Sequence, residues 1–346
     1  MHKTTLLIDN PIRLTDLSQL RQIAGAGPVL ILTHENPDPD GLASGKAFAA
    51  LLSAWDIASH LVYSGLVGRA ENRMMHQLLT PEWDYKTVLP DLHEYTATAI
   101  LDSQPGAGNN NLSAGLIPDI VIDHHLPVRS ESLSVPYKDI RAGIGATVSM
   151  VYQYLEVAQI PISAELATAM FYGLRADTNG LSRGATTTDG VIYVKLLDIL
   201  DHQRLLQVEQ SGLSRDYFQA FHDGLTNAQI VGKTITTYLG DMHRPDFVAE
   251  MADLLVRFEE VQSALCLGQY QNMLYFSLRT GLVEKDAGLI VQQIIMPPGK
   301  AGGHGTIAGG QYPLHGDDVR QVVAKLQANF LHLMNEQGTT TALITG

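Results

Sequence analysis

Three short apolar runs of this chain lead into aspartate or histidine, the side chains that bind metal ions and transfer protons. Runs of this length are typical of strands buried in a parallel sheet. Burying such polar groups costs several kcal/mol unless they are paired or bound to metal, so a purely structural role does not explain them. The residues that follow the runs at 29–32, 98–101 and 120–122 are, in order, His34, Asp38 and Asp40; Asp102; and Asp123, His124 and His125. Their joint position favours a site, although D-P-D-G alone is typical of a turn and a lone His-His pair of surface or core.

Carboxylate and imidazole donors without a thiolate favour Mn²⁺ or Mg²⁺, and Zn²⁺ or Co²⁺ less. In an open α/β sheet, ligands bind beyond the carboxyl ends of the strands, where these residues are expected. One ion would leave several carboxylates uncompensated, whereas two ions bridged by a shared aspartate would balance them. Two ions about 3.5–4 Å apart suit attack on phosphorus, because both the attacking and the leaving oxygen are stabilised. The sequence therefore predicts a two-metal site for chemistry at phosphorus.

Length and composition describe a globular protein with room for two domains. The chain has 346 residues, 45% apolar and 17% charged, and a formal net charge of −13. This charge argues against a grip on long nucleic acids, which depends on Lys and Arg, but it leaves a small anionic ligand open. Cys266 is the only cysteine, so neither an intrachain disulfide nor a thiolate metal site is expected. We find no signal segment and no run of about 18 apolar residues, so we expect a cytoplasmic protein without a membrane partner. Whether it forms a homodimer stays open.

Alternating strand and helix patterns predict an α/β fold, with a parallel sheet and helices on both faces in the first domain. Its expected strands are 29–32, 57–63, 98–101 and 120–122, and its expected helices are 15–26, 42–55, 69–79, 145–157, 163–175 and 188–200. The smaller second domain is expected to hold a mixed sheet with strands at 230–239, 263–270 and 273–278, helices at 245–257, 287–295 and 317–334, and a glycine-rich loop at 301–310. The predicted boundaries are 1–200 for the metal-binding domain, 201–226 for a helical connector and 227–346 for a substrate-binding domain. We expect the active site in a cleft between the two domains.

With these residues, the chain resembles the DHH phosphoesterases, a family named for the triplet found here at Asp123, His124 and His125. The sequence H-E-N-P-D-P-D-G at 34–41 is similar to the family's first motif, and I-L-D-S at 100–103 is similar to the second. L-R-A-D-T-N-G at 174–180 is similar to the fourth and adds Asp177, which periodicity alone does not reveal. The resemblance covers nearly the whole chain and is to RecJ-like members of the oligoribonuclease and pAp-phosphatase type.

Carried over to this sequence, the resemblance implies two divalent ions, with Mn²⁺ favoured and Mg²⁺ or Co²⁺ as alternatives. The implied ligands are His34, Asp38 and Asp102 for the first ion, and Asp40, Asp102, His124 and Asp177 for the second. His125 would face the substrate phosphate, and Asp123 would orient an imidazole. A water or hydroxide between the ions would be the nucleophile. The implied catalytic residues are Asp102, Asp123 and His125.

The second domain resembles the DHH-associated substrate domain in two motifs. Ser277-Leu278-Arg279 is similar to its Ser-x-Arg strand motif, and Ala301-Gly302-Gly303-His304 is similar to its glycine-rich motif, with alanine for the usual first glycine. Arg279 can clamp a phosphate bidentately, the glycines admit close approach of an anion or base, and His304 can donate to a phosphate oxygen. The implied substrate-binding residues are His125, Ser277, Arg279, Gly302, Gly303 and His304.

The resemblance implies a hydrolase of ester bonds, of the phosphodiesterase, exonuclease or 3′-nucleotidase type. Its substrates would be short nucleotides: nanoRNA, linear dinucleotides such as pApA, or pAp. An inorganic pyrophosphatase or exopolyphosphatase on the same fold is the alternative enzyme. It needs a basic cradle, for which Arg279 and Lys300 are the only evident cations. A nucleotide-binding sensor is the alternative from another class, and the intact set of ligands disfavours it.

Overall fold

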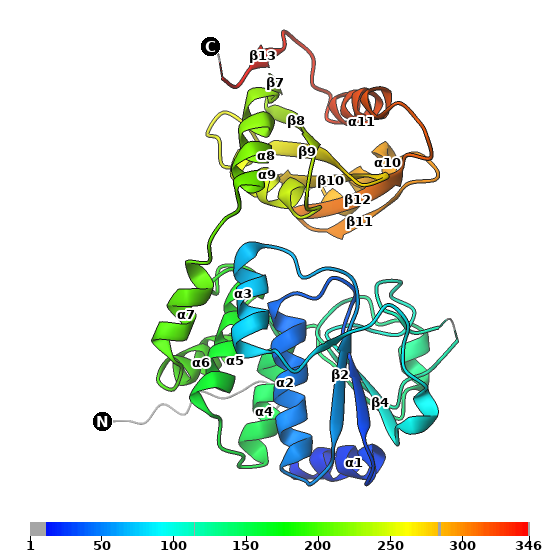
Figure 1. Ribbon diagram of the computed structural model, residues 1–346, viewed down its shortest axis with the longest axis vertical. Coiled ribbons are helices and arrows are strands. Elements are labelled where there is room, and N and C mark those ends of the chain that lie inside the picture. The colour runs from blue at the N-terminus through cyan, green and yellow to red at the C-terminus, as the bar shows by residue number, and fades with distance from the viewer. Residues whose placement is uncertain (1–11, 114, 283–284, 345–346) are drawn as a thin grey trace. The chain divides into compact units, whose positions relative to one another are not determined.

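The computed structural model describes residues 12–113, 115–282 and 285–344, except for the side chain of His304. The chain divides into two compact units between Ser211 and Gly212, and Figure 1 colours it along its length. The segment 201–226, expected as a connector, is split by this division: α7 (His202–Glu209) belongs to the first unit and α8 (Arg215–Thr226) to the second. In the described part of the chain, none of the helices has the length and apolar character that crossing a bilayer requires.

Six parallel strands form the sheet of the first unit, in the order β3-β2-β1-β4-β5-β6. They are β1 (Val29–Leu32), β2 (Ser59–Tyr63), β3 (Asp84–Tyr85), β4 (Ala97–Leu101), β5 (Ile120–Asp123) and β6 (Tyr137–Ile140). Every residue of β1, β4 and β5 is buried, as expected for apolar strands of a parallel sheet. The chain runs outward from β1 to β3 and, in the opposite direction, from β4 to β6. The strand order therefore reverses between β1 and β4, and the carboxyl ends at such a reversal form a crevice for ligands.

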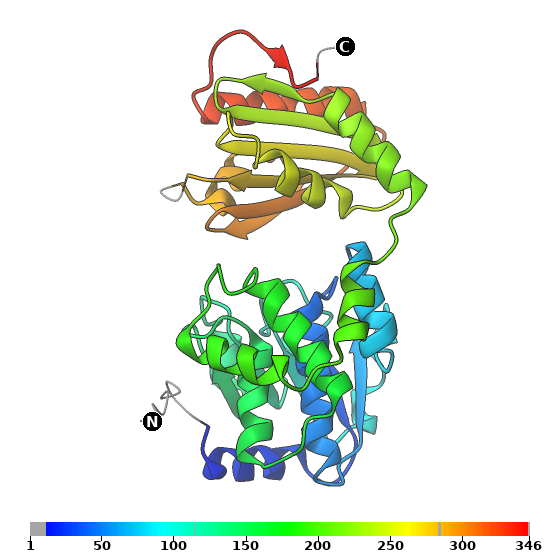
Figure 2. The same cartoon turned by 90° about the vertical axis from the view of Figure 1, so that its left-hand side faces the viewer.

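The α-helices of the first unit share one large apolar core with the sheet. They are α1 (Leu14–Ala24), α2 (Pro39–Ser53), α3 (Ala70–Leu79), α4 (Thr147–Val157), α5 (Ala164–Asp177), α6 (Thr187–Leu197) and α7. Figure 2 shows several of them in front of the sheet. Leu30, Ile100 and Val121 point to the other face, which carries loops and two short 3-10 helices, η1 (Leu92–Glu94) and η2 (Glu131–Ser134). The prediction placed helices on both faces of the sheet. In the structure this second face has no α-helix among the described residues, because the connections from β3 to β6 contain only loops and 3-10 helices.

The helix α2 begins before its predicted start at Leu42, and this change matters for the site. Asp38 is its N-cap: the carboxylate accepts a hydrogen bond from the Gly41 amide at 3.0 Å. Pro39 occupies the first helical position, where no amide hydrogen is needed. D-P-D-G is therefore the first turn of a helix and not a free turn. This turn places Asp38 and Asp40 close to the end of β1.

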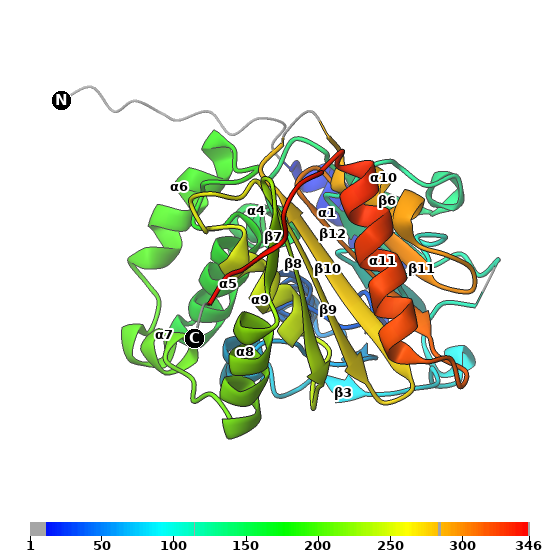
Figure 3. The same cartoon turned by 90° about the horizontal axis from the view of Figure 1, so that it is seen from above.

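Seven strands form the sheet of the second unit, in the order β11-β12-β10-β9-β8-β7-β13. They are β7 (Gln229–Val231), β8 (Thr234–Asp241), β9 (Ser263–Tyr270), β10 (Met273–Thr280), β11 (Lys300–His304), β12 (Ile307–Pro313) and β13 (Thr341–Ala342). The pair β8 and β9 is parallel and the other pairs are antiparallel, so the predicted mixed sheet is confirmed. The helices α8 and α9 (Phe247–Leu255) cover one face, and α10 (Ala287–Ile294) and α11 (Val319–Leu333) cover the other (Figure 3).

The prediction of a glycine-rich loop at 301–310 is wrong. This segment forms most of β11 and β12, an antiparallel pair in which Gly302 faces Gly309. A Cβ added at Gly303 would lie 2.4 Å from the Cα of Ala308, so the two strands approach closely because they lack side chains there. The short strands β3, β6 and β13 were also not predicted, since runs of two to four mixed residues carry little periodicity.

Candidate metal centre

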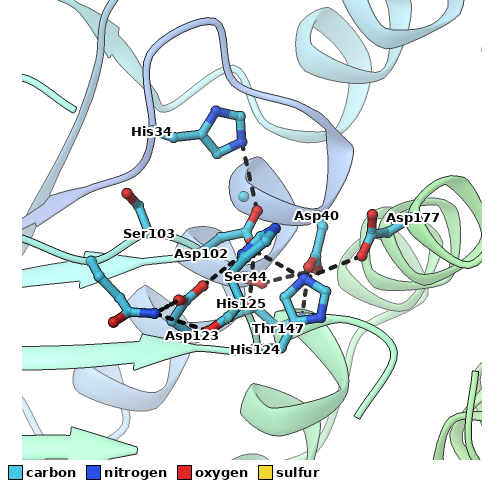
Figure 4. Close-up of polar contacts among 12 residues, drawn as sticks. His34, Asp40, Ser44, Asp102, Ser103, Asp123, His124, His125, Thr147 and Asp177 are labelled. Atoms are coloured by element: carbon cyan, nitrogen blue, oxygen red, sulfur yellow. Dashed lines mark hydrogen bonds and ion pairs between the residues drawn. The ribbon is translucent and has the colours of Figure 1, made fainter. Parts of the chain in front are cut away.

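The carboxyl ends of β1, β4 and β5 bring the predicted ligands of the first unit together. Asp102 directly follows β4, Asp123 ends β5, and Asp177 is the last residue of α5. Three groups of side chains have ligand atoms within 4.8 Å of one another: His34, Asp38 and Asp102; Asp40, His124 and Asp177; and Asp102, His124 and His125. Figure 4 shows Asp40, Asp102, His124 and Asp177 converging from different elements. All six predicted metal ligands belong to these groups, and their role as ligands stays a prediction.

The first group is arranged around His34. Its Nε2 lies 3.7 Å from Asp38 Oδ1 and 3.6 Å from Asp102 Oδ2. Its Nδ1 lies 2.9 Å from the carbonyl oxygen of Glu35, a partner that orients the ring so that Nε2 faces the carboxylates. Burial by itself lowers the pKa of His34, but the hydrogen bond and charge of Asp38 outweigh it and raise the pKa to about 9. The site thus attracts positive charge strongly.

The second group is held by the start of α4. Asp40 is 1% exposed, and its two oxygens accept hydrogen bonds from the amides of Thr147 at 2.6 Å and Val148 at 2.8 Å. The positive end of a helix dipole suits a carboxylate at this position. His124 Nε2 lies 3.3 Å from Asp177 Oδ2 and 3.6 Å from Asp102 Oδ1. That nitrogen is buried and has no hydrogen-bond partner among the described residues, as expected of an atom that is reserved for a metal ion.

Asp102 belongs to the first group and also lies close to His124 of the second. Its side chain is 1% exposed, and its Oδ1 accepts a hydrogen bond from the Thr147 hydroxyl at 2.8 Å. Its backbone has a φ of 61°, a left-handed conformation that Asp adopts more readily than most residues and that costs energy. Burial and the charges of Asp38, Asp123 and Asp177 raise the pKa of Asp102 well above its usual value. Burial and neighbouring carboxylates also raise the pKa values of Asp40 and Asp177.

These observations show that the residues fit divalent cations. The crowded, buried carboxylates disfavour their own ionisation, and a positive ion would remove that penalty. The unpartnered His124 Nε2 points into the same space, and the donor set of imidazole and carboxylate without thiolate matches hard divalent ions.

His125 differs from the other two imidazoles because it is half exposed. Its side chain is 47% exposed, and its Nδ1 lies 2.8 Å from Oδ1 of the fully buried Asp123. Burial lowers the pKa of His125, but the hydrogen bond and charge of Asp123 raise it overall. Asp123 therefore contacts His125, and the Nδ1 of His124 instead lies 3.2 Å from the carbonyl oxygen of Ile144. Figure 4 shows Asp123 beside the two histidines.

Two residues that support this centre were not predicted. Thr147 contributes an amide to Asp40 and a hydroxyl to Asp102. Gln104 donates to Asp123 Oδ2 at 2.7 Å. The available signals were a threonine at a helix start and a glutamine directly behind a strand end, and both are too common to single out.

The predicted substrate-binding residues other than His125 lie in the second unit. Arg279 is only 9% exposed: its Nε donates to Asp253 Oδ1 at 2.5 Å and its Nη1 to the hydroxyl of Ser277 at 2.7 Å. Of the three guanidinium nitrogens, Nη2 alone has no hydrogen-bond partner among the described residues. The predicted bidentate clamp of a phosphate would need more than this one nitrogen. Gly302 has open space where a Cβ would lie. The side chain of His304 lies outside the described part of the structure.

Residues 28–174 match the family model described as "DHH family, N-terminal domain". The first unit contains a DHH family N-terminal domain over these residues. The chain is 31% identical over 316 residues to an uncharacterized protein of Methanocaldococcus jannaschii, an alignment that covers 91% of the chain and 64% of that relative. The chain thus spans less than two thirds of the archaeal protein.

Two further comparisons concern a relative and a solved structure. The chain is 25% identical over 256 residues to a probable manganese-dependent inorganic pyrophosphatase of Streptococcus agalactiae, covering 68% of the chain and 76% of that protein. A crystal structure of an exopolyphosphatase-related protein from Bacteroides fragilis matches with a TM-score of 0.75 and covers 95% of this chain and 100% of that one. At 14% identity this match concerns the fold alone. It confirms the predicted α/β architecture with two units.

Proposed function

We propose that this protein is a metal-dependent phosphohydrolase of the DHH family that cleaves phosphoester bonds in short nucleotides. The observation that carries the proposal is the pair of ligand groups that meet at Asp102, with a buried His124 Nε2 in one of them that has no hydrogen-bond partner among the described residues. Such an arrangement serves binding of cations, and it lies at the strand reversal where α/β sheets bind ligands.

Two divalent ions are proposed, with Mn²⁺ as the first candidate because a relative is named a manganese-dependent enzyme. The first would be held by His34, Asp38 and Asp102, and the second by Asp40, Asp102, His124 and Asp177. When bound, such ions lower the pKa of water and polarise phosphoryl oxygens. The half-exposed His125, whose Nδ1 is held by Asp123, is free to present its Nε2 to a substrate oxygen.

The second unit supports a nucleotide more than a polyanion. The charge of Arg279 is compensated by Asp253, and one guanidinium nitrogen is left for a ligand. Such a site suits a single phosphate group, whereas pyrophosphate or polyphosphate calls for several uncompensated cations. The edge strand β11 offers the backbone amides that do not pair with β12, and Gly302 leaves space for a sugar or base.

Hydrolysis of inorganic pyrophosphate or polyphosphate is the second candidate. It is favoured by the similarity to the Streptococcus agalactiae protein, whose name gives inorganic pyrophosphatase. A nucleotide sensor without catalysis is less favoured, because all six predicted metal ligands are present and grouped.

The test is hydrolysis, in the presence of Mn²⁺, of pAp, pApA, a labelled RNA five-mer, a long single strand, pyrophosphate and a short polyphosphate. Asp102→Asn serves as the inactive control for contaminating phosphatases. We expect cleavage of the first three substrates by the wild type only. Cleavage of pyrophosphate or polyphosphate alone would replace the proposal by the second candidate. Binding of nucleotides without any cleavage would support the sensor.

A further inference from the structure

The polar segment Ser103–Asn110, which directly follows Asp102, contacts both loops that carry predicted ligands. The carbonyl oxygen of Asn109 accepts a hydrogen bond from the amide of Glu35, next to His34, at 2.6 Å. The side chain of Asn110 donates to the carbonyl oxygen of Gln104 at 2.8 Å and to the Ser103 hydroxyl at 3.1 Å. Hydrogen bonds therefore tie both ends of this segment to the centre.

Gln104 makes the contacts of this segment with the D-H-H loop. Its side chain is buried, with 3% of the residue exposed. Its Nε2 donates to Asp123 Oδ2 at 2.7 Å and to the carbonyl oxygen of His125 at 3.0 Å. Its Oε1 accepts from the amide of Arg129 at 2.8 Å and from the Ser132 hydroxyl at 3.1 Å. A carboxamide has two donor hydrogens and two acceptor lone pairs, so Gln104 uses its whole hydrogen-bonding capacity here.

These contacts determine how Asp123 meets His125. One carboxylate oxygen of Asp123 is taken by Gln104 and the other lies 2.8 Å from His125 Nδ1. Because Gln104 also binds the backbone of His125, both the carboxylate and the residue that carries the imidazole are fixed by one side chain. The ring then has a single orientation, in which Nε2 is the nitrogen left for a ligand.

We propose that Gln104 is a positioning residue for the proposed hydrolysis, which acts through Asp123 to hold the imidazole of His125 towards the substrate phosphate. It does not touch the substrate. Nor does its side chain form a hydrogen bond with any of the six predicted metal ligands in the described structure. Its removal is therefore expected to lower turnover without lowering the affinity for metal ions.

The test compares Gln104→Met, which keeps the length of the side chain, with Gln104→Glu, which keeps the two acceptor positions but places a carboxylate against Asp123. Asn111→Ala is the matched control. It is a neighbouring amide whose side chain reaches the carbonyl oxygen of Lys86 instead. Thermal unfolding of the full-length protein shows whether each variant folds. If the Met variant does not fold, the measurements below are made on the Glu variant.

Kinetics on the substrate that the wild type cleaves should show kcat reduced about 10- to 100-fold in both variants. KM, Mn²⁺ affinity by calorimetry and all properties of the control should be unchanged. In a double-mutant cycle, Gln104→Met added to Asp123→Asn should cost nothing further, because both act on the same ring. Independent, additive losses would overturn the proposal, and so would a wild-type kcat in a folded Gln104→Met protein.

A measurement that needs no activity separates this inference from the proposed function. In the Mg²⁺-loaded full-length protein labelled with ¹⁵N-histidine, the Nδ1 proton of His125 should give a resonance, assigned by its absence in His125→Gln. We expect that resonance to shift or disappear in Gln104→Met. An unchanged resonance would refute the positioning role, even if the protein proved to be a pyrophosphatase or a sensor.

Discussion

Replacing Asp102 by Asn tests the metal centre most directly, because it changes the charge and little else. Asn adopts the left-handed backbone conformation at least as readily as Asp, so the φ of 61° is preserved. The amide oxygen can still accept the hydrogen bond from Thr147. The volume is nearly the same, so the packing of this buried side chain should not change. What is lost is the one carboxylate that contacts both His34 and His124.

The expected effect can be worked out for the metal-loaded protein. An ion present at 100 times its dissociation constant stabilises a folded protein by about 2.7 kcal/mol. For a unit of this size each kcal/mol shifts the melting temperature by about 2–4 °C, so each bound Mn²⁺ should raise that of the wild type by about 5–11 °C. Because Asp102 is expected to ligate both ions, the Asn variant should lose most of this increase together with all turnover.

Without metal the two proteins should differ in the opposite sense. Ligand atoms of Asp38 and Asp102 lie within 4.8 Å, and two ionised carboxylates at that distance repel each other by about 3 kcal/mol at an effective dielectric constant of about 20. The raised pKa of Asp102 indicates that burial and such repulsions outweigh the attraction of the nearby imidazoles. The metal-free Asn variant should therefore melt no lower than the metal-free wild type.

Tryptophan fluorescence provides the assay, since Trp55 and Trp83 are the only tryptophans and both lie in the first unit. Melting is recorded for each protein with a chelator and with excess Mn²⁺. Asp56→Asn is the matched control, because Asp56 is exposed and also has a positive φ, of 62°; it should show the full wild-type increase. An Asp102→Asn protein that keeps the Mn²⁺-induced increase would refute the shared-ligand arrangement.

Three further predictions concern the supports of the site. Arg279→Ala should raise KM about 10-fold or more with little change in kcat, because a charge-assisted hydrogen bond to phosphate contributes about 1.5–3 kcal/mol; an unchanged KM in steady-state assays of the folded variant would refute the proposed hydrogen bond from Arg279 to the substrate phosphate. Thr147→Val removes the hydroxyl that binds Asp102 and should weaken Mn²⁺ binding in calorimetry about 10-fold, whereas Thr147→Ser should not; equal affinities would show that the hydroxyl is dispensable. Gly173→Ala places a Cβ 2.9 Å from the carbonyl oxygen of Pro39 and should lower stability by about 1–3 kcal/mol. The urea midpoint measures this last effect, and a wild-type midpoint would contradict the close approach of α5 to α2.

Local patterns in the sequence were enough to predict the strands β1, β2, β4 and β5 of the first sheet and the residues of most of the candidate metal centre. Uninterrupted apolar runs identified β1, β4 and β5, and the residue types behind them identified His34, Asp102 and the D-H-H triplet. This worked because parallel strands align their carboxyl ends at one edge of the sheet, so side chains far apart in sequence must meet there. Periodicity did not identify Asp177, which the resemblance to the DHH family supplied.

The tertiary structure alone determined which groups support these side chains. The amides of Thr147 and Val148 bind Asp40 across more than a hundred residues of sequence, and Gln104 reaches Asp123 from the next strand end. Asp253, on the helix α9, compensates the charge of Arg279, which lies on the strand β10. Local patterns report only which face of an element is buried. Hydrogen-bond partners across elements depend on register and packing, which the sequence determines only through the complete fold.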